Sequence, residues 1–178
     1  MKWIGTEGGP LILIPLPLVA RWEGTDPPNG GRVVHAEFRW SVPEGIATDY
    51  DRACDVRDNL GIIDVAGAHA LVLGDEPNDT CFCSTSDGGV LVRWDFAPSL
   101  EAVETLLHRL PTEGFVSESL QFNVQQSPFV LFDSACSGSA IKESVIVALP
   151  PGIYEVATCR WQPDRETCLL LHRLMQAS

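Results

Sequence analysis

The sequence has few basic residues. Its 178 residues include 12 Lys and Arg against 24 Asp and Glu, which gives a formal net charge of −12 at pH 7. Nucleic-acid binding needs clustered Lys and Arg for the phosphates, and docking on anionic lipid needs basic segments as well. The composition therefore argues against a general nucleic-acid binder and against a membrane-surface protein. An acidic chain instead suits a basic partner or cations, or its charge serves solubility.

No apolar segment is long enough to span a bilayer. The longest run extends from Leu11 to Ala20, and Pro15 and Pro17 interrupt it. The run also lacks the basic start and the small-residue cleavage site of a signal peptide. We therefore expect a cytoplasmic protein whose cysteines are reduced thiols. The chain has six of them: Cys54, Cys81, Cys83, Cys136, Cys159 and Cys168.

The motifs of several enzyme classes are missing. The sequence contains no Gly-x-Ser-x-Gly nucleophile motif, no catalytic-cysteine signature and no phosphate-binding glycine motif. His35, His69, His108 and His172 are available as bases, but none stands in a recognisable nucleophile motif. We therefore predict no catalytic residue, no enzyme activity and no cofactor.

Metal-ligating patterns are incomplete as well. Cys81-x-Cys83 offers two thiols, but a structural zinc site needs four ligands, and no second pair follows at metal spacing. Asp49, Asp51, Asp55 and Asp58 form a carboxylate series without the turn glycine and closing glutamate of an EF-hand. We predict no metal site. A metal-dependent enzyme that uses the 49–58 carboxylates is the alternative that this series leaves open.

The negative charge is concentrated in the middle of the chain. Residues 1–43 and 134–178 each carry four acids and four bases, whereas residues 44–79 carry nine acids and two bases. Residues 80–133 add seven acids and two bases. A neutral scaffold with one acidic region is suited to electrostatic capture of a basic partner. Solvated loops would produce the same pattern without any partner.

The hydrophobic pattern predicts mainly strands. Leu11–Ile14 is a short buried strand, and Val34–Trp40 alternates with the period of a half-buried strand. Thr48 can cap a short helix over residues 49–54. Two hairpins are expected, one joining Ile62–Val65 to Ala70–Leu73 and one turning at residues 87–89. Further strands are predicted near residues 121–124, 128–132, 144–149, 153–160 and 167–174.

One amphipathic helix is predicted near residues 99–110, and Pro111 ends it. Its apolar positions recur at helical spacing: Leu100, Val103, Leu106, Leu107 and Leu110. Many strands around one main helix indicate an α+β fold of mainly antiparallel sheet. The length predicts a single compact domain over residues 1–178.

Two pairs of segments resemble each other within the chain. Gly9–Leu13 is similar to Ser127–Leu131, and Gly61–Val65 is similar to Gly152–Val156. Two similar halves, about residues 1–96 and 114–178, would explain both pairs if the central helix joined them. Chance similarity between apolar strands explains them as well.

Several segments match a family pattern, in order, along nearly the whole chain. They are Trp3-Ile4, Gly8–Pro15, Trp22-x-Gly24, Asp49–Cys54 (DYDRAC), Gly61–Ile63, Ala70–Pro77 (ALVLGDEP), Arg93-Trp94, Pro128–Ala135 and Leu149–Gly152. On these segments the sequence resembles the immunity protein 21 family of bacterial polymorphic toxin systems. Residues 28–43 and 138–142 depart from the pattern, and both stretches are candidates for shaping the surface that a particular toxin contacts.

The resemblance implies a small cytoplasmic immunity protein that binds and silences a cognate toxin C-terminal domain. An acidic inhibitor can cover a basic active cleft, such as that of a nuclease, so we expect a basic toxin domain as partner. A regulatory or adaptor module that binds another basic protein remains a second alternative.

The partner-binding residues are expected in the exposed part of the acidic region, because motifs shared by a family with varied partners more plausibly build the fold. Trp22 and Trp161 lie beside loops and charged residues, so we also expect interface roles for them. The predicted partner-binding acids are Asp49, Asp51, Asp55, Asp58, Asp75, Glu76 and Asp79.

Overall fold

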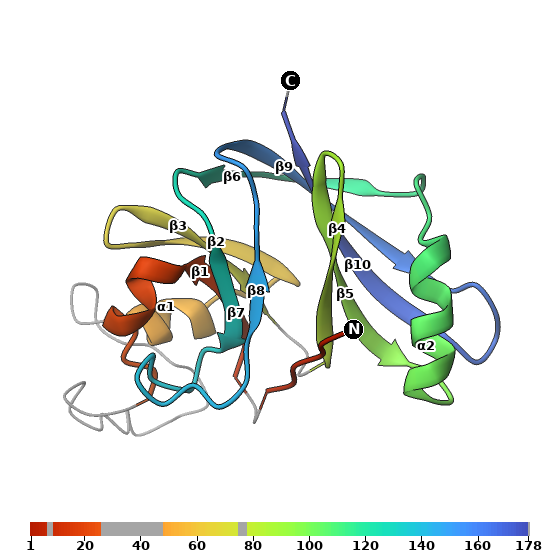
Figure 1. The fold of residues 1–178 in the computed structure, drawn as a ribbon, viewed down its shortest axis with the longest axis horizontal. Coiled ribbons are helices and arrows are strands. Elements are labelled where there is room, and N and C mark those ends of the chain that lie inside the picture. Colours follow the sequence, from red (N-terminus) through yellow and green to blue (C-terminus); the bar gives the residue numbers. More distant parts are fainter. Residues whose placement is uncertain (7–8, 26–47, 75–77, 178) are drawn as a thin grey trace.

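A computed structural model describes residues 1–6, 9–25, 48–74 and 78–177 of the chain. Its described residues form two five-stranded antiparallel sheets, which lie beside each other in Figure 1. This confirms the α+β expectation of mainly antiparallel sheet. The strand predicted at Val34–Trp40 lies outside the described residues.

The first sheet has the strand order β2-β3-β1-β7-β8. Its strands are β1 (Leu11–Pro15), β2 (Leu60–Val65), β3 (Ala68–Leu73), β7 (Phe129–Asp133) and β8 (Val145–Val147). The second sheet has the order β4-β5-β10-β9-β6. Its strands are β4 (Thr80–Thr85), β5 (Gly88–Phe96), β6 (Val116–Val124), β9 (Gly152–Trp161) and β10 (Cys168–Gln176). Every pairing within these sheets is antiparallel.

Both predicted hairpins are confirmed. β2 pairs with β3 through a turn at Ala66 and Gly67, and both turn residues have positive φ, 52° and 85°. Two successive residues with positive φ make the tight turn whose twist matches that of the flanking strands. β4 pairs with β5, and the chain reverses between Thr85 and Gly88.

The predicted helix near residues 99–110 is confirmed as two consecutive elements. α2 (Leu100–Leu106) begins after Ser99, whose hydroxyl accepts a hydrogen bond from the Ala102 amide at 3.2 Å. The chain then tightens into a 3-10 turn, η2 (Leu107–Arg109). Val103 and Leu106 are buried, and Val103 packs on the outer face of the second sheet, as Figure 1 shows for the helix.

The main core lies between the two sheets. It contains alternate residues of central strands, among them Leu11, Leu13, Leu91, Tyr154 and Leu174. A second cluster, with Ile12, Ile14 and Val72 at its centre, fills the outer face of the first sheet beneath η1 (Leu16–Arg21) and α1 (Asp49–Cys54). Because β1 is buried on both faces, its sequence reads as a continuous apolar run rather than as an alternating one.

The two similar segments around β1 and β7 are neighbours in the first sheet, where Leu13 lies opposite Leu131. The second pair of similar segments, at β2 and β9, lies in different sheets. Residues 1–96 and 114–178 both contribute strands to both sheets. The single domain and its division into repeated halves stay predictions.

Trp22 is part of the core, so the expected interface role for it is wrong. Its side chain is 2% exposed, and its indole N–H donates to the carbonyl oxygen of Ser134 at 2.8 Å. The ring meets Phe132 edge-on at 6.3 Å between centroids. The charged neighbours of Trp22 in sequence, Arg21 and Glu23, are exposed and flank a residue that points inward.

Candidate functional site

Two of the predicted acids, Asp49 and Asp51, stabilise helix α1. Thr48 caps this helix and accepts a hydrogen bond from the Asp51 amide at 3.1 Å. The Asp51 carboxylate in turn accepts two hydrogen bonds of 2.8 Å, one from the amide and one from the hydroxyl of Thr48. This reciprocal arrangement is a capping box. Asp49 forms an ion pair with Arg52, whose guanidinium also donates to the Asp64 carbonyl at 2.7 Å.

These contacts bear on the alternative of a cation held by the 49–58 carboxylates. A Ca²⁺ site needs six to eight converging oxygens. Both carboxylates at the start of the series already have hydrogen-bonding or ionic partners on their own helix. Within residues 1–6, 9–25, 48–74 and 78–177, no group of three or more His, Cys, Asp or Glu is arranged to hold a metal.

Asp55 and Asp58 are exposed. Asp55 is the C-cap residue that follows α1, and Asp58 lies in the loop that leads to β2. The loop lies against the end of β3, because the Gly74 amide donates to the Asn59 carbonyl at 3.1 Å. A side chain at Gly74 would come within 2.6 Å of the Asp58 carbonyl oxygen. Asp75 and Glu76 lie outside the described residues.

Asp79 stands immediately before β4, on the second sheet, and is exposed. It lines an open groove of about 290 Å³ together with Asn78, Trp94 and Asp95. The Trp94 amide donates to the Asp79 carbonyl at 2.8 Å, which fixes the two residues side by side. We call this hollow the Trp94 groove.

A buried arginine brings these acidic segments to the same end of the molecule. Arg93 lies opposite Thr80 in the β4–β5 ladder and is 1% exposed. Its guanidinium donates to the carbonyl oxygens of Gly74, at 3.0 Å, and Asn59, at 3.4 Å. Asp58 precedes Asn59, and Asp79 precedes Thr80. The structure therefore places Asp58 and Asp79 next to residues that one arginine holds together.

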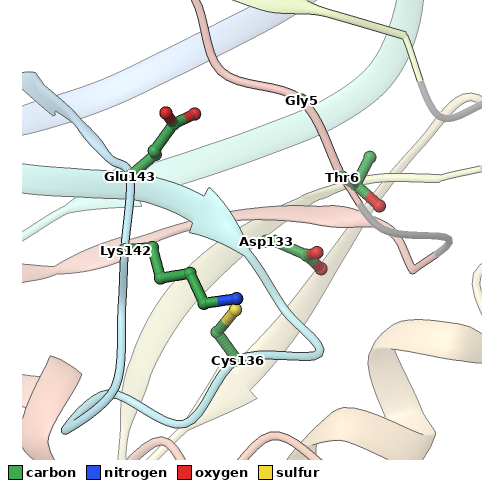
Figure 2. A pocket seen from close by; sticks show the side chains of 6 residues that line it. All are labelled: Gly5, Thr6, Asp133, Cys136, Lys142 and Glu143. Atoms are coloured by element: carbon green, nitrogen blue, oxygen red, sulfur yellow. The ribbon is translucent and has the colours of Figure 1, made fainter.

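A second hollow, of about 350 Å³, lies between the N-terminal segment and the loop after β7. Figure 2 shows the Lys142 side chain extending toward the Cys136 thiol, while the Glu143 carboxylate points away from both. The lining residues are Gly5, Thr6, Asp133, Cys136, Lys142 and Glu143. No local pattern in the sequence indicates this hollow, because its residues come from three separate segments, and Lys142 belongs to a stretch that departs from the family pattern.

The described histidines with a cross-strand contact have structural roles. Nδ1 of His69 accepts a hydrogen bond from the Asn123 amide at 3.1 Å and links β3 to β6 of the other sheet. His172 is fully buried, and its Nδ1 contacts the Thr158 hydroxyl at 2.8 Å. Burial, with a smaller contribution from the charge of Arg93, lowers the pKa of His172 to about 3. His172 is therefore neutral at physiological pH.

Several thiols have a raised pKa, whereas a nucleophilic thiol has a lowered one. Burial raises the pKa of Cys54, Cys159 and Cys168, which keeps these thiols protonated near neutral pH. Cys83 differs, because a hydrogen bond from the Cys81 thiol lowers its pKa. Both cysteines lie on the face of β4 that packs toward α2. The same hydrogen bond raises the pKa of Cys81 and lowers that of Cys83, so Cys83 is the more reactive of the two.

The described part of the chain contains no helix with the length and apolar character of a membrane span. A search among curated proteins found no match, and a search among solved structures found none either. A comparison with protein families gave a match to the model of immunity protein 21 over residues 2–167. Because this match spans nearly all of the 178 residues, the chain belongs to the immunity protein 21 family.

Proposed function

We propose that this protein protects bacterial cells by binding a cognate toxin C-terminal domain and blocking its action. The observation that carries the proposal is the family match over residues 2–167. In this proposal inhibition is stoichiometric, takes place in the cytoplasm and requires neither chemistry nor a cofactor. Silencing a lethal enzyme by binding alone requires nanomolar affinity or better, about −12 kcal/mol.

We further propose that the toxin presents a basic surface, as the active cleft of a nuclease would. The formal charge of −12 supports this, and so does its distribution, with nine acids and two bases in residues 44–79. Of the predicted partner-binding acids, Asp55, Asp58 and Asp79 are exposed and have their carboxylates available at the surface. Complementary charge accelerates association, while affinity also needs apolar or aromatic anchors at the centre of the interface.

The test is co-expression with the C-terminal domain of the product of the neighbouring gene. That domain is expressed in a bacterial host with and without this protein, and survivors are counted. We expect rescue, together with a complex that co-purifies in a one-to-one ratio. A toxic domain that this protein neither binds nor neutralises would contradict the assigned partner, and rescue without any physical complex would contradict inhibition by binding.

An inactive variant of the toxin separates binding from chemistry. If this protein inhibits by binding, it forms the same complex with an inactive toxin as with the active one. If it acted as an enzyme on the toxin or its product, substoichiometric amounts would protect the host. Titration of purified toxin activity against this protein therefore decides between the two, because inhibition by binding ends at an equivalence point.

A further inference from the structure

The Trp94 groove brings one aromatic residue together with two carboxylates. Trp94 is half-buried and packs edge-on against Trp3, with 6.2 Å between ring centroids. Asp79 and Asp95 line the same groove, and Asn78 adds an amide. The backbone contact between Trp94 and Asp79 and the ring contact with Trp3 hold the aromatic wall in place before any partner arrives.

An arginine side chain is the group that such a groove recognises best. A guanidinium stacks on an aromatic face while its N–H groups donate to carboxylates in the ring's periphery. A lysine ammonium is a strongly hydrated point charge and makes poorer use of a planar wall. The volume of about 290 Å³ lies at the small end of ligand pockets and fits one side chain rather than a folded segment.

One of the carboxylates that line the groove already pairs with a guanidinium of the chain itself. Asp95 pairs with the guanidinium of Arg160, which reaches it from β9. The Asp95 side chain is 16% exposed and that of Arg160 is 64% exposed, so the pair lies at the surface of the protein. Asp79, by contrast, makes no ion pair with any residue in the described ranges. The groove therefore holds one compensated carboxylate and one that a partner's cation can compensate.

We propose that the Trp94 groove seats an arginine side chain of the toxin, with the guanidinium on the Trp94 ring and paired to Asp79. This inference rests on the proposed function and adds the chemistry of one contact to it. Asp95, held by Arg160, lines the same groove, and Asp79 supplies the charge that the toxin's guanidinium meets. A half-buried aromatic ring beside a carboxylate that has no ion pair within the described ranges has the properties of an interface hot spot.

The first experiment does not depend on the toxin. The probe is N-acetyl-arginine amide, and the control is N-acetyl-citrulline amide, which has nearly the same shape without the charge. Binding to the full chain is followed by NMR at the indole N–H of Trp94. We expect a saturable shift with the arginine compound and none with the citrulline compound, and we expect Asp79→Asn to abolish the shift.

A matched control removes one charge elsewhere on the same sheet. Glu155 on β9 is exposed and lies opposite Met175 of β10. Met175 is six residues along β10 from Leu169, and Leu169 lies opposite Trp94. At about 3.3 Å per residue, the two sites are roughly 20 Å apart. Glu155→Gln should leave the arginine-dependent shift unchanged. Equal loss in Asp79→Asn and Glu155→Gln would show general charge attraction and overturn the specific groove.

The second experiment uses the toxin domain that the protein neutralises. Loss of a hot-spot contact lowers affinity by roughly 30-fold or more. We expect that loss for Asp79→Asn and a similar one for Trp94→Ala, with Glu155→Gln close to wild type. Asp79→Asn keeps the backbone contact to Trp94, and thermal unfolding verifies that each variant is folded.

The outcomes separate this inference from the proposed function. Wild-type neutralisation by a folded Asp79→Asn variant would overturn the arginine site while the immunity function stands. If no toxin is found, the titration with N-acetyl-arginine amide still tests by itself whether the groove binds an arginine side chain. A shift of equal size with the citrulline compound would also overturn the inference, because binding would then not depend on the guanidinium charge.

Discussion

The Arg93 guanidinium in the second sheet donates a 3.0 Å hydrogen bond to the Gly74 carbonyl at the end of β3 in the first sheet. This contact joins the two sheets at the edge where the acidic loops gather. Arg93 is almost fully buried, and the carbonyl dipoles of Gly74 and Asn59 contribute to the compensation of its charge inside the protein. A buried cation fixed in this way is costly to disturb.

Replacing Arg93 should therefore destabilise the fold. Arg93→Met keeps much of the side-chain volume but leaves the carbonyl oxygens of Gly74 and Asn59 without these donors. Each buried acceptor that loses its partner costs about 1–3 kcal/mol, so we expect a loss of roughly 2–5 kcal/mol in the free energy of unfolding. Urea denaturation measures it. Arg109→Met, at an exposed arginine, is the matched control, and an equal effect of the two would contradict a bridging role.

His172 should make the protein less stable as the pH falls. Its pKa is about 3 in the folded chain because burial disfavours the cation, while an unfolded chain has the ordinary value of 6.5. The unfolded state therefore binds the extra proton first, and stability present above pH 6.5 is lost as the pH falls from about 6.5 toward 3. The slope for one proton is about 1.4 kcal/mol per pH unit.

NMR titration of the His172 ring and urea denaturation between pH 7 and 5 check this prediction. The ring should stay neutral through that range, and stability should fall with decreasing pH. In His172→Gln the fall over the same range should be smaller, because the carboxyl groups titrate mostly below it. A ring that takes up a proton near pH 6.5 in the folded state would contradict the prediction.

The sequence predicted the helices and hairpins that depend on residues close together in the chain. Thr48 and Asp51 complete a capping box within four residues, and the β2–β3 hairpin follows from two apolar strands around a tight turn. η1 was not predicted, because Leu16–Arg21 continues the apolar run of β1 and only the structure shows where Pro15 ends the strand. The local sequence pattern therefore predicts whether a segment is a helix or a strand, but it does not predict every residue at which the element begins or ends.

Long-range contacts could not be predicted in the same way. Alternation along β5 gives no sign that Arg93 points into the core, because the partners of its guanidinium come from residues 59 and 74. The Trp94 groove likewise depends on residues from the start of β4 and the end of β5, with Trp3 packed behind the ring. The count of acidic residues predicted Asp79, Asp49 and Asp51 alike as partner-binding residues. It could not show that the carboxylates of Asp49 and Asp51 stabilise α1.

The four acids of the 49–58 series should therefore separate into two pairs by their effects. Asp55→Lys with Asp58→Lys should slow toxin association several-fold at low salt and flatten its salt dependence, because both side chains are exposed. The matched control is Asp164→Lys with Glu166→Lys, in the exposed loop between β9 and β10. Stopped-flow association at several salt concentrations measures the effect.

Asp51→Ala, in contrast, should lower stability, by about 1 kcal/mol, since it removes half of a capping box. Its association rate with the toxin should change less than that of the Asp55 and Asp58 pair. An unchanged association rate of the Asp55 and Asp58 variant at low salt would contradict this prediction and indicate that the toxin contacts another surface.

Cys83 should react with an alkylating agent before the thiols whose pKa is raised, Cys54, Cys81, Cys159 and Cys168. The hydrogen bond from Cys81 lowers the pKa of Cys83 from its ordinary value of 9.0 and, with a smaller contribution from the positive N-terminal amine, outweighs the opposing effect of burial, whereas burial dominates and raises the pKa of Cys54 and Cys159. Since the thiolate is the reacting form, iodoacetamide at pH 7.5 should label Cys83 ahead of Cys54, Cys81, Cys159 and Cys168, and the labelling rate of Cys83 should level off at a lower pH than theirs. Peptide mass spectrometry over time locates the label. Because the Cys81 thiol donates the hydrogen bond, Cys81→Ala should slow labelling at Cys83, and unchanged or faster labelling would contradict the assigned cause.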